Sequence, residues 1–134
     1  MINNSMIADT LEAAADLYEA EKYDWCQGNY HRSTDQGISI CASQAIRMAC
    51  GEKLYSDSPG HWISDQTRVN LSLLRAAFRA LNLTPFGSEG DLIKWNDQGQ
   101  LVTLAFPLNT SPRRTKQEVI DLFKEKAKDL RNQS

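Results

Sequence analysis

Four segments of the chain repeat apolar residues at the period of an α-helix, and this pattern restricts the fold more than any other feature. In the first segment, SMIADTLEAAADLYEAE, the residues Ile7, Leu11, Ala14 and Tyr18 form one stripe. The second segment is ISICASQAIRMACG, which ends at Gly51. Its small side chains let another backbone approach closely, so we expect this helix to be the central and most buried one.

The third helical segment begins at Ser64, and its core stripe ends at Leu81. The fourth begins with the capping box TKQE at residues 115–118. Between them, the segment 91–107 (DLIKWNDQGQLVTLAFP) contains two short apolar runs around an Asn-Asp-Gln-Gly turn, which predicts a β-hairpin.

Residues 22–37 and 51–63 are rich in turn-forming residues and are predicted to be irregular connections. The sequence therefore predicts a single globular domain, residues 1–134, of the mainly α class. Its expected architecture is a compact four-helix domain with one small β-hairpin before the last helix.

Composition places the chain among soluble globular proteins, with 134 residues, 41% apolar residues and a net charge of −2. No apolar run is long enough to cross a bilayer, and the start of the chain has no secretion signal. The three cysteines show no disulfide spacing. We therefore predict a cytoplasmic protein with reduced thiols and no membrane contact.

The charges are unevenly distributed. Residues 1–36 carry seven acids and two bases, whereas residues 113–131 carry seven bases and four acids. These two regions attract each other, are simply solvated faces, or dock a charged partner. Arg68, Arg75 and Arg79 follow one line of the third predicted helix, but the chain as a whole is acidic. Nucleic-acid binding is therefore not favoured.

Four short motifs carry a resemblance to a known group of proteins. They are W-C-Q-G at 25–28, C-A at 41–42, W-N-D at 95–97, and R-T followed by E-V at 114–119. Their order resembles a family of small uncharacterised proteins from actinobacteria and bacteriophages. In that family W-N-D is followed almost directly by R-T, whereas residues 98–113 intervene here, so the resemblance does not extend to the predicted hairpin. It implies a shared fold and a phage setting, and no activity.

One enzymatic hypothesis is a small cysteine-dependent hydrolase. Cys41 is expected near a helix N-terminus, where the dipole lowers the pKa of a thiol. His61 follows it in the chain, and Asn96 or Asp97 comes later, which is the residue order of papain-like hydrolases. A cysteine that opens an alanine-rich helix is more often a small buried apolar residue.

The sequence does not favour a metal site or a cofactor. The available ligands are Cys26, His31, Cys41, Cys50 and His61. Structural zinc sites usually have paired ligands two to four residues apart, and this spacing is missing. The glycines are scattered and form no phosphate-binding loop, so we predict neither metal nor cofactor.

The two predicted connections contain five aromatic residues, Tyr23, Trp25, Tyr30, Tyr55 and Trp62, which either seal the core or bind a partner. Trp95-Asn96-Asp97 similarly either forms a turn or supplies a carboxylate beside Gln27. The residues that we predict to contact a ligand or partner are Trp25, Gln27, Tyr30, His31, Trp62 and Arg75.

The leading hypothesis for function is a non-enzymatic interaction protein whose partner is a host or cellular protein. The resemblance makes a phage-encoded inhibitor of a host process, such as a defence system, its specific form. The alternatives are the hydrolase and a module that sequesters a small molecule, such as a nucleotide signal, between Trp25, Gln27 and arginine side chains.

Overall fold

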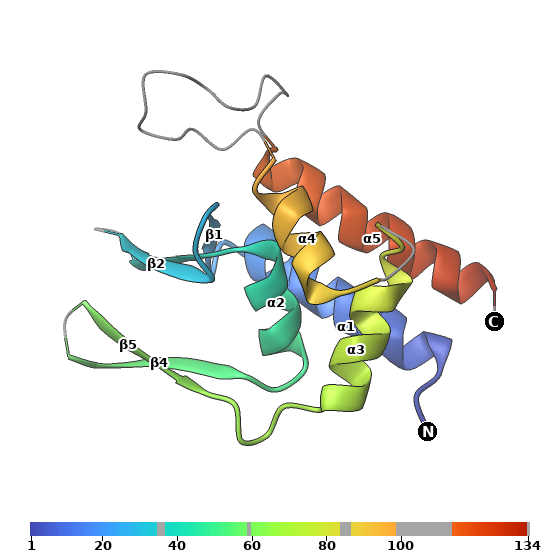
Figure 1. The fold of residues 1–134 in the computed structure, drawn as a ribbon, viewed down its shortest axis with the longest axis horizontal. Coiled ribbons are helices and arrows are strands. Elements are labelled where there is room, and N and C mark those ends of the chain that lie inside the picture. Colours follow the sequence, from blue (N-terminus) through green and yellow to red (C-terminus); the bar gives the residue numbers. More distant parts are fainter. Residues whose placement is uncertain (35–36, 59, 84–86, 99–113, 134) are drawn as a thin grey trace.

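The computed structural model describes residues 1–34, 37–58, 60–83, 87–98 and 114–133, and this part of the chain forms five helices and five short strands (Figure 1). The helices are α1 (Asn4–Glu19), α2 (Ala42–Ala49), α3 (Leu71–Ala80), α4 (Glu89–Asn96) and α5 (Lys116–Asn132). The strands are β1 (Asp24–Trp25), β2 (His31–Thr34), β3 (Gly37–Ile40), β4 (Lys53–Ser58) and β5 (His61–Asp65).

The strands form two small sheets that lie on one side of the helices (Figure 1). In the first sheet β3 is central, with β1 parallel to it on one side and β2 antiparallel on the other. The second sheet is the antiparallel hairpin β4–β5, which has an irregularity between Ser56 and Ser58. The fold is therefore mixed α/β, and the prediction of a mainly α, four-helix domain with one hairpin is wrong.

The strands lie largely in the two segments that were predicted to be irregular, but β3 includes residues 38–40 of the predicted second helix and β5 includes residues 64–65 of the predicted third helix. Both helices were therefore predicted to start too early. Both segments contain turn-forming residues at their tips, but β-branched and aromatic residues between the turns supply the pairing edges. Ile38 and Ile40 are buried on β3, and Tyr55 pairs with Ile63 across the hairpin. Strands of two to six residues leave too short a pattern to be recognised against the turn signals.

The predicted hairpin at 91–107 is also contradicted where the structure describes it, because residues 89–96 form α4. Ser88 and Asp91 form a capping box at the start of this helix, with Ser88 Oγ accepting from the Asp91 backbone N–H at 3.3 Å. Leu92 and Asn96 are one turn apart and are both buried. Residues 99–107 lie outside the described residues.

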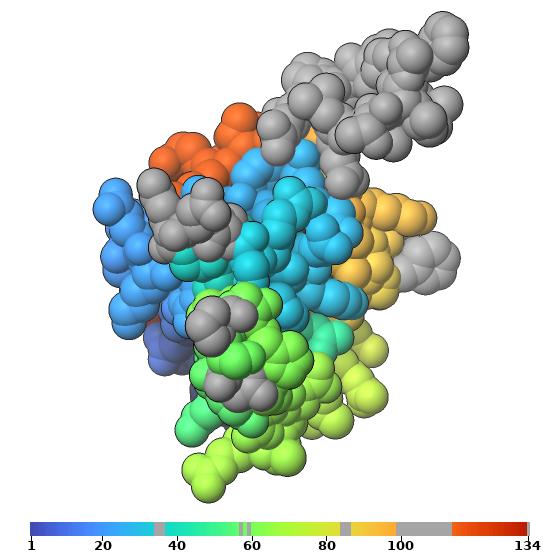
Figure 2. All heavy atoms as spheres, turned by 90° about the vertical axis from the view of Figure 1, so that its left-hand side faces the viewer, coloured from blue at the N-terminus to red at the C-terminus, as the bar shows by residue number. Residues whose placement is uncertain are grey.

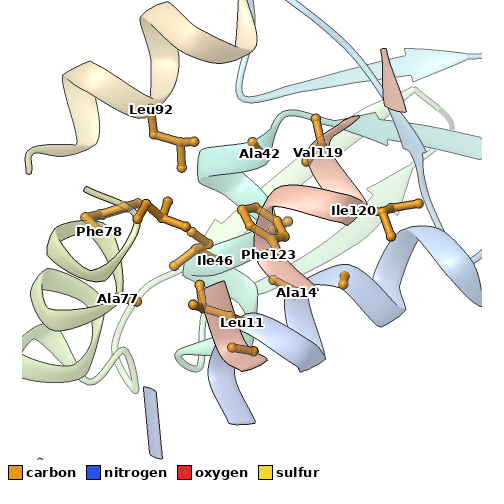
Figure 3. Close-up of a cluster of buried hydrophobic side chains, with 14 of the residues drawn as sticks. Leu11, Ala14, Ala42, Ile46, Ala77, Phe78, Leu92, Val119, Ile120 and Phe123 are labelled. Carbon is orange, nitrogen blue, oxygen red and sulfur yellow. The ribbon is translucent and has the colours of Figure 1, made fainter. Parts of the chain in front are cut away.

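Helices α1 and α5 pack against each other along their lengths and hold much of the core (Figures 1 and 3). Leu11 and Ala14 of α1 and Phe123 of α5 are fully buried. Tyr18 is also fully buried, and its hydroxyl donates to the Ile40 carbonyl of β3 at 3.0 Å. This bond ties the helix pair to the first sheet, and the predicted α1 and α5 segments are confirmed.

The charged ends of the chain bind each other. Arg131 of α5 contacts Asp9 at 2.6 Å and Glu12 at 2.9 Å, both on α1, and Lys124 pairs with Glu19. The two charged regions therefore attract each other, as one of the alternatives for the uneven charge predicted.

The third predicted helix begins later than expected. Helix α3 starts at Leu71, where the Asn70 side chain accepts from the Leu73 backbone N–H at 3.1 Å. Arg68 precedes the helix, so the predicted line of three arginines on one helix does not form. Helix α2 contacts α1, α3 and α4 and is buried through its first five residues, as predicted for the central helix.

Among the described helices, none combines the length and the apolar character that crossing a membrane requires.

Substitution of Gly51 is expected to destabilise the fold. Gly51 ends the α2 turn at φ +118°, and an added Cβ would lie 2.4 Å from the Arg68 carbonyl oxygen. We expect Gly51→Ala to lower the free energy of unfolding by about 2–4 kcal/mol, measured by urea denaturation. Gly37→Ala is the control, since φ there is +136° and no described atom lies within 4 Å of the new Cβ. Equal losses in the two variants would contradict a steric role for the Arg68 contact.

Candidate functional site

Asn96, the last residue of α4, is fully buried at the centre of a hydrogen-bond network. Its Oδ1 accepts from the Trp25 indole Nε1 at 2.6 Å and from the Ala42 backbone N–H at 2.9 Å. Its Nδ2 donates to the Cys26 carbonyl at 3.1 Å and to Asp97 Oδ1 at 3.0 Å. Because both ends of the amide are fully partnered, burial is compensated and α4 is joined to β1 and α2.

Gln27 and Gly28 extend this network. Gln27 is buried, and its Nε2 donates to the carbonyls of Asn96 at 2.8 Å and Gln98 at 3.0 Å. Gly28 has φ +82°, and its N–H donates to Asp97 Oδ1 at 2.9 Å. Gln27 and Asp97, both predicted as site residues, thus make contacts within the fold.

Arg114, which lies just before α5, completes the arrangement. Its Nε donates to the Trp95 carbonyl at 3.1 Å, and its guanidinium lies 4.0 Å from the centre of the Trp95 ring. Its backbone N–H donates to the Gln98 carbonyl at 2.9 Å, and Nη1 donates to Glu118 at 2.7 Å. The four motifs quoted for the resemblance therefore meet in one network, and their spacing is explained by folding.

A pocket of about 120 Å³, which we call the thiol pocket, lies beside this network. Its lining residues are Gly28, Asn29, Tyr30, Cys41, Ile93, Asn96 and Asp97. Cys41 caps α2, and its Sγ accepts from the Gln44 backbone N–H at 3.5 Å. Burial raises the pKa of the Cys41 thiol to about 12, and this outweighs the lowering by the Gln44 N–H. The thiol is therefore protonated at neutral pH.

The structure brings only part of the predicted hydrolase group together. Cys41 and Asp97 line the thiol pocket, but His61 is exposed at the start of β5, and the lining of that pocket does not include it. The tip of the β4–β5 hairpin projects away from the start of α2 (Figure 1). Asn96 is held by the network. This arrangement does not favour a thiolate nucleophile.

The other cysteines are also buried. Burial raises the pKa of Cys26 to about 11 and that of Cys50 to about 11. Within the described ranges, no three histidine, cysteine, aspartate or glutamate side chains gather closely enough to hold a metal ion.

A second pocket of about 180 Å³, which we call the polar pocket, lies between β2, α2 and β5. Its lining residues are Tyr30, His31, Gln44, Arg47, Glu52, Ser64 and Gln66. Figure 2 shows the surface of the first sheet, in blue and cyan, meeting the green hairpin on one face of the molecule. The pocket is thus built where the two small sheets approach α2.

Three side chains of the polar pocket have unused hydrogen-bonding atoms. Among the residues that the structure describes, the buried polar side-chain atoms without a hydrogen-bond partner are His31 Nδ1, Gln44 Nε2 and Glu52 Oε2. All three residues line this one pocket. Gln44 is 2% exposed and Glu52 is 4% exposed. An unsatisfied buried polar atom costs about 1–3 kcal/mol, so three such atoms at one pocket call for water or a ligand there and make it the candidate site.

The remaining contacts of Glu52 fix its orientation. Ser64 Oγ donates to Glu52 Oε1, and Gln66 Nε2 lies 3.5 Å from the same oxygen. Both contacts come from β5 or the residues after it, so one carboxylate oxygen is held by the hairpin while Oε2 is not engaged.

Arg47 forms the cationic wall of the polar pocket. Its Nε and Nη2 donate to Glu89 at 2.6 Å and 2.8 Å, and Ser43 Oγ donates to the same carboxylate at 2.7 Å. The Tyr30 hydroxyl donates to Glu89 at 3.2 Å, and Arg47 lies 5.2 Å from the centre of the Tyr30 ring. Partial burial raises the pKa of Glu89, but these hydrogen bonds outweigh it, so that pKa is below its ordinary value. Arg47 and Glu89 therefore form a charged pair.

The predicted binding residues fall into three places. Tyr30 and His31 line the polar pocket, and Trp25 belongs to the Asn96 network. Trp62 is half-buried on β5, Arg75 is exposed on α3, and the lining of neither pocket contains them.

Sequence reasoning missed Gln44 and Glu52. Both lie in or next to the segment that was predicted to be the most buried helix. A polar side chain in a buried helix needs a hydrogen-bond partner. The presence of Gln44 in the predicted buried helix, and of Glu52 next to it, was therefore the sequence feature that could have indicated a site.

Replacement of Asn96 by aspartate is expected to cost about 3–5 kcal/mol at neutral pH. A carboxylate oxygen would replace Nδ2 and face the Cys26 carbonyl and Asp97. Burial beside Asp97 would raise the pKa of the new carboxyl, so stability lost at neutral pH should return as the pH falls below that pKa. Urea unfolding of Asn96→Asp and of wild type, followed by tryptophan fluorescence at neutral pH and at a pH below the pKa of the new carboxyl, measures the loss of stability and its recovery. Lys94→Ala, on the exposed face of α4, is the control, and a pH-independent loss would contradict the network's role.

The cysteines of the folded protein are expected to resist alkylation. With a pKa of about 12, the Cys41 thiol should react with iodoacetamide at least about 10³-fold more slowly than an ordinary thiol at neutral pH. Mass spectrometry of native and urea-unfolded protein measures the rates. Rapid, stoichiometric labelling of native Cys41 would instead indicate an activated nucleophile.

Comparison with known proteins identifies the family. A family model described as a family of unknown function, DUF6197, matches residues 3–129. No curated protein and no solved structure matches the chain. The predicted membership of an uncharacterised family is confirmed, whereas the match does not test the quoted motifs or an actinobacterial or phage origin. Because the match covers nearly the whole sequence, the chain belongs to DUF6197, a family of unknown function.

Proposed function

We propose that the protein is a non-enzymatic binding domain that holds a small polar molecule in the polar pocket. The observation that carries this proposal is the convergence of His31 Nδ1, Gln44 Nε2 and Glu52 Oε2 on one cavity. Folding alone gives no reason to leave three buried atoms unpaired, since polar interiors are normally satisfied. A ligand with matching groups would satisfy them when it binds.

The side chains and backbone that line the polar pocket are held in place by contacts within the fold, which supports a binding role. Glu52 is oriented by Ser64, and Arg47 is held by Glu89 from α4. The backbone beside His31 is set by sheet pairing and by the hydrogen bond from Cys41 N to the Tyr30 carbonyl at 2.9 Å. Such preorganised groups lower the entropic cost of binding.

A binding role agrees better with the chemistry of the site than a hydrolytic one. The Cys41 thiol is protonated, and Asn96 is committed to the network. Sequestration of a small molecule needs no catalytic group. We retain as part of the proposal the cytoplasmic setting, which composition and the cysteines suggested, and the inhibition of a host process, which the sequence resemblance suggested.

The proposal predicts that removal of one unpaired group stabilises the free protein. Gln44→Met keeps the side-chain volume and removes a buried amide donor that has no acceptor. We expect the free energy of unfolding to rise by about 1 kcal/mol, because the desolvation cost of the amide disappears. Chemical denaturation of the ligand-free protein measures the change.

Gln117→Met is the matched control. Gln117 is exposed on α5, so the same chemical change there should alter stability by less than about 0.5 kcal/mol. A loss of stability in Gln44→Met would show that the amide serves the fold, and the proposed function would then fail.

A further inference from the structure

We infer that the polar pocket recognises a compact organic cation, an ammonium or guanidinium group that carries a neighbouring oxygen acceptor. This inference rests on the proposed binding function and names the chemistry of its ligand. Amino-acid amides and the N-terminal residue of a peptide both present this combination.

The charges at the pocket favour a cation as the ligand. The Arg47 guanidinium is paired with Glu89 at 2.6 Å, which leaves the carboxylate of Glu52 as the excess charge among these groups. Glu52 is only 4% exposed, and its described side-chain hydrogen bonds involve the neutral groups of Ser64 and Gln66. The Arg47 guanidinium also interacts electrostatically with Glu52, but it is hydrogen-bonded to Glu89. Two carboxylates, Glu52 and Glu89, therefore share one guanidinium, and a bound cation would supply the further counter-charge that buried Glu52 lacks. N–H groups of that cation would donate to Oε2.

Gln44 and His31 specify the second part of the ligand. Gln44 Nε2 is a buried donor and needs an oxygen acceptor. The imidazole Nδ1 of His31 can accept from a further N–H of the cation when that nitrogen is unprotonated. A cation with a carbonyl or carboxylate oxygen next to it therefore satisfies all three atoms, whereas a simple anion leaves Glu52 Oε2 without a partner.

The size of the pocket limits the ligand. Its volume of about 180 Å³ is smaller than the roughly 300–1,000 Å³ of sites for drug-sized molecules. A single amino-acid unit is the appropriate scale. The exposed edge of Tyr30, which is 43% exposed, leaves one wall in contact with solvent.

Titrations of the ¹⁵N-labelled full chain, followed by NMR, test the inference with matched probes. L-Alaninamide carries both the ammonium and the oxygen. Ethylammonium lacks the oxygen, N-acetyl-L-alaninamide lacks the charge, and propionate is an anion. We expect L-alaninamide to shift the signals of His31, Gln44 and Glu52 with a dissociation constant of about 1 mM or tighter. Ethylammonium should bind about tenfold more weakly, and the neutral and anionic probes should leave these signals unchanged.

Glu52→Gln tests the residue that carries the inference. We expect this variant to bind L-alaninamide at least about tenfold more weakly, while Glu125→Gln, on the exposed surface of α5, binds it normally. The NMR spectrum of Glu52→Gln reports whether it folds. If it does not fold, the comparison of L-alaninamide with its N-acetyl analogue on the wild-type protein decides the question.

A tripeptide, Ala-Gly-Gly, separates the two sources of this chemistry. Binding as tight as that of L-alaninamide indicates peptide N-termini, and much weaker binding indicates free small molecules. Either result supports the inferred chemistry.

Different results would overturn the cation inference and the proposed binding function. Binding of propionate or N-acetyl-L-alaninamide at the polar pocket in preference to the cations overturns the cation inference and leaves the binding function standing. If no probe binds, the inference is also overturned. The proposed function falls with it only if Gln44→Met fails to stabilise the free protein.

Discussion

The buried amide of Asn96 is the interaction on which the rest of the structure depends. It joins the Trp25 indole, the start of α2 at Ala42 and the carbonyl of Cys26, which lie far apart in the sequence. By fixing where β1, α2 and α4 meet, this residue also sets the position of the residues that follow β1 and of the helix that carries Gln44. The polar pocket is therefore a consequence of the same junction, although Asn96 does not line it.

The helices with long apolar stripes could be predicted from the sequence, because α1 and α5 each bury one face over many turns. The strands could not, since pairs such as Trp25 with Ile40 depend on partners that periodicity does not reveal. Helix α4 was missed for a different reason. Its Trp-Asn-Asp end reads locally as a turn, and the weaker signal of the Ser88 capping box at its start was overlooked.

The candidate site likewise contains residues that could be predicted from the local sequence and residues that could be recognised only from contacts between distant segments. Tyr30 and His31 were singled out for their chemistry, and both line the polar pocket. Gln44 and Glu52 can be recognised as site residues only in the folded chain, where the hairpin and α2 line one pocket and the polar atoms of both residues are buried without partners. Conversely, Trp25 and Gln27 looked like binding residues but serve the junction. In this fold, polar and aromatic side chains form the buried hydrogen-bond network as well as the lining of the polar pocket.

The claim that most needs testing is that His31, Gln44 and Glu52 face a common space and do not satisfy one another. A high-resolution crystal structure of the protein grown with L-alaninamide measures this most directly. The predicted result is a ligand whose ammonium lies within hydrogen-bond distance of Glu52 Oε2 and whose oxygen accepts from Gln44 Nε2. A closed pocket in which Gln44 Nε2 donates directly to Glu52 Oε2 would contradict it, because the unpaired groups would then be a structural pair.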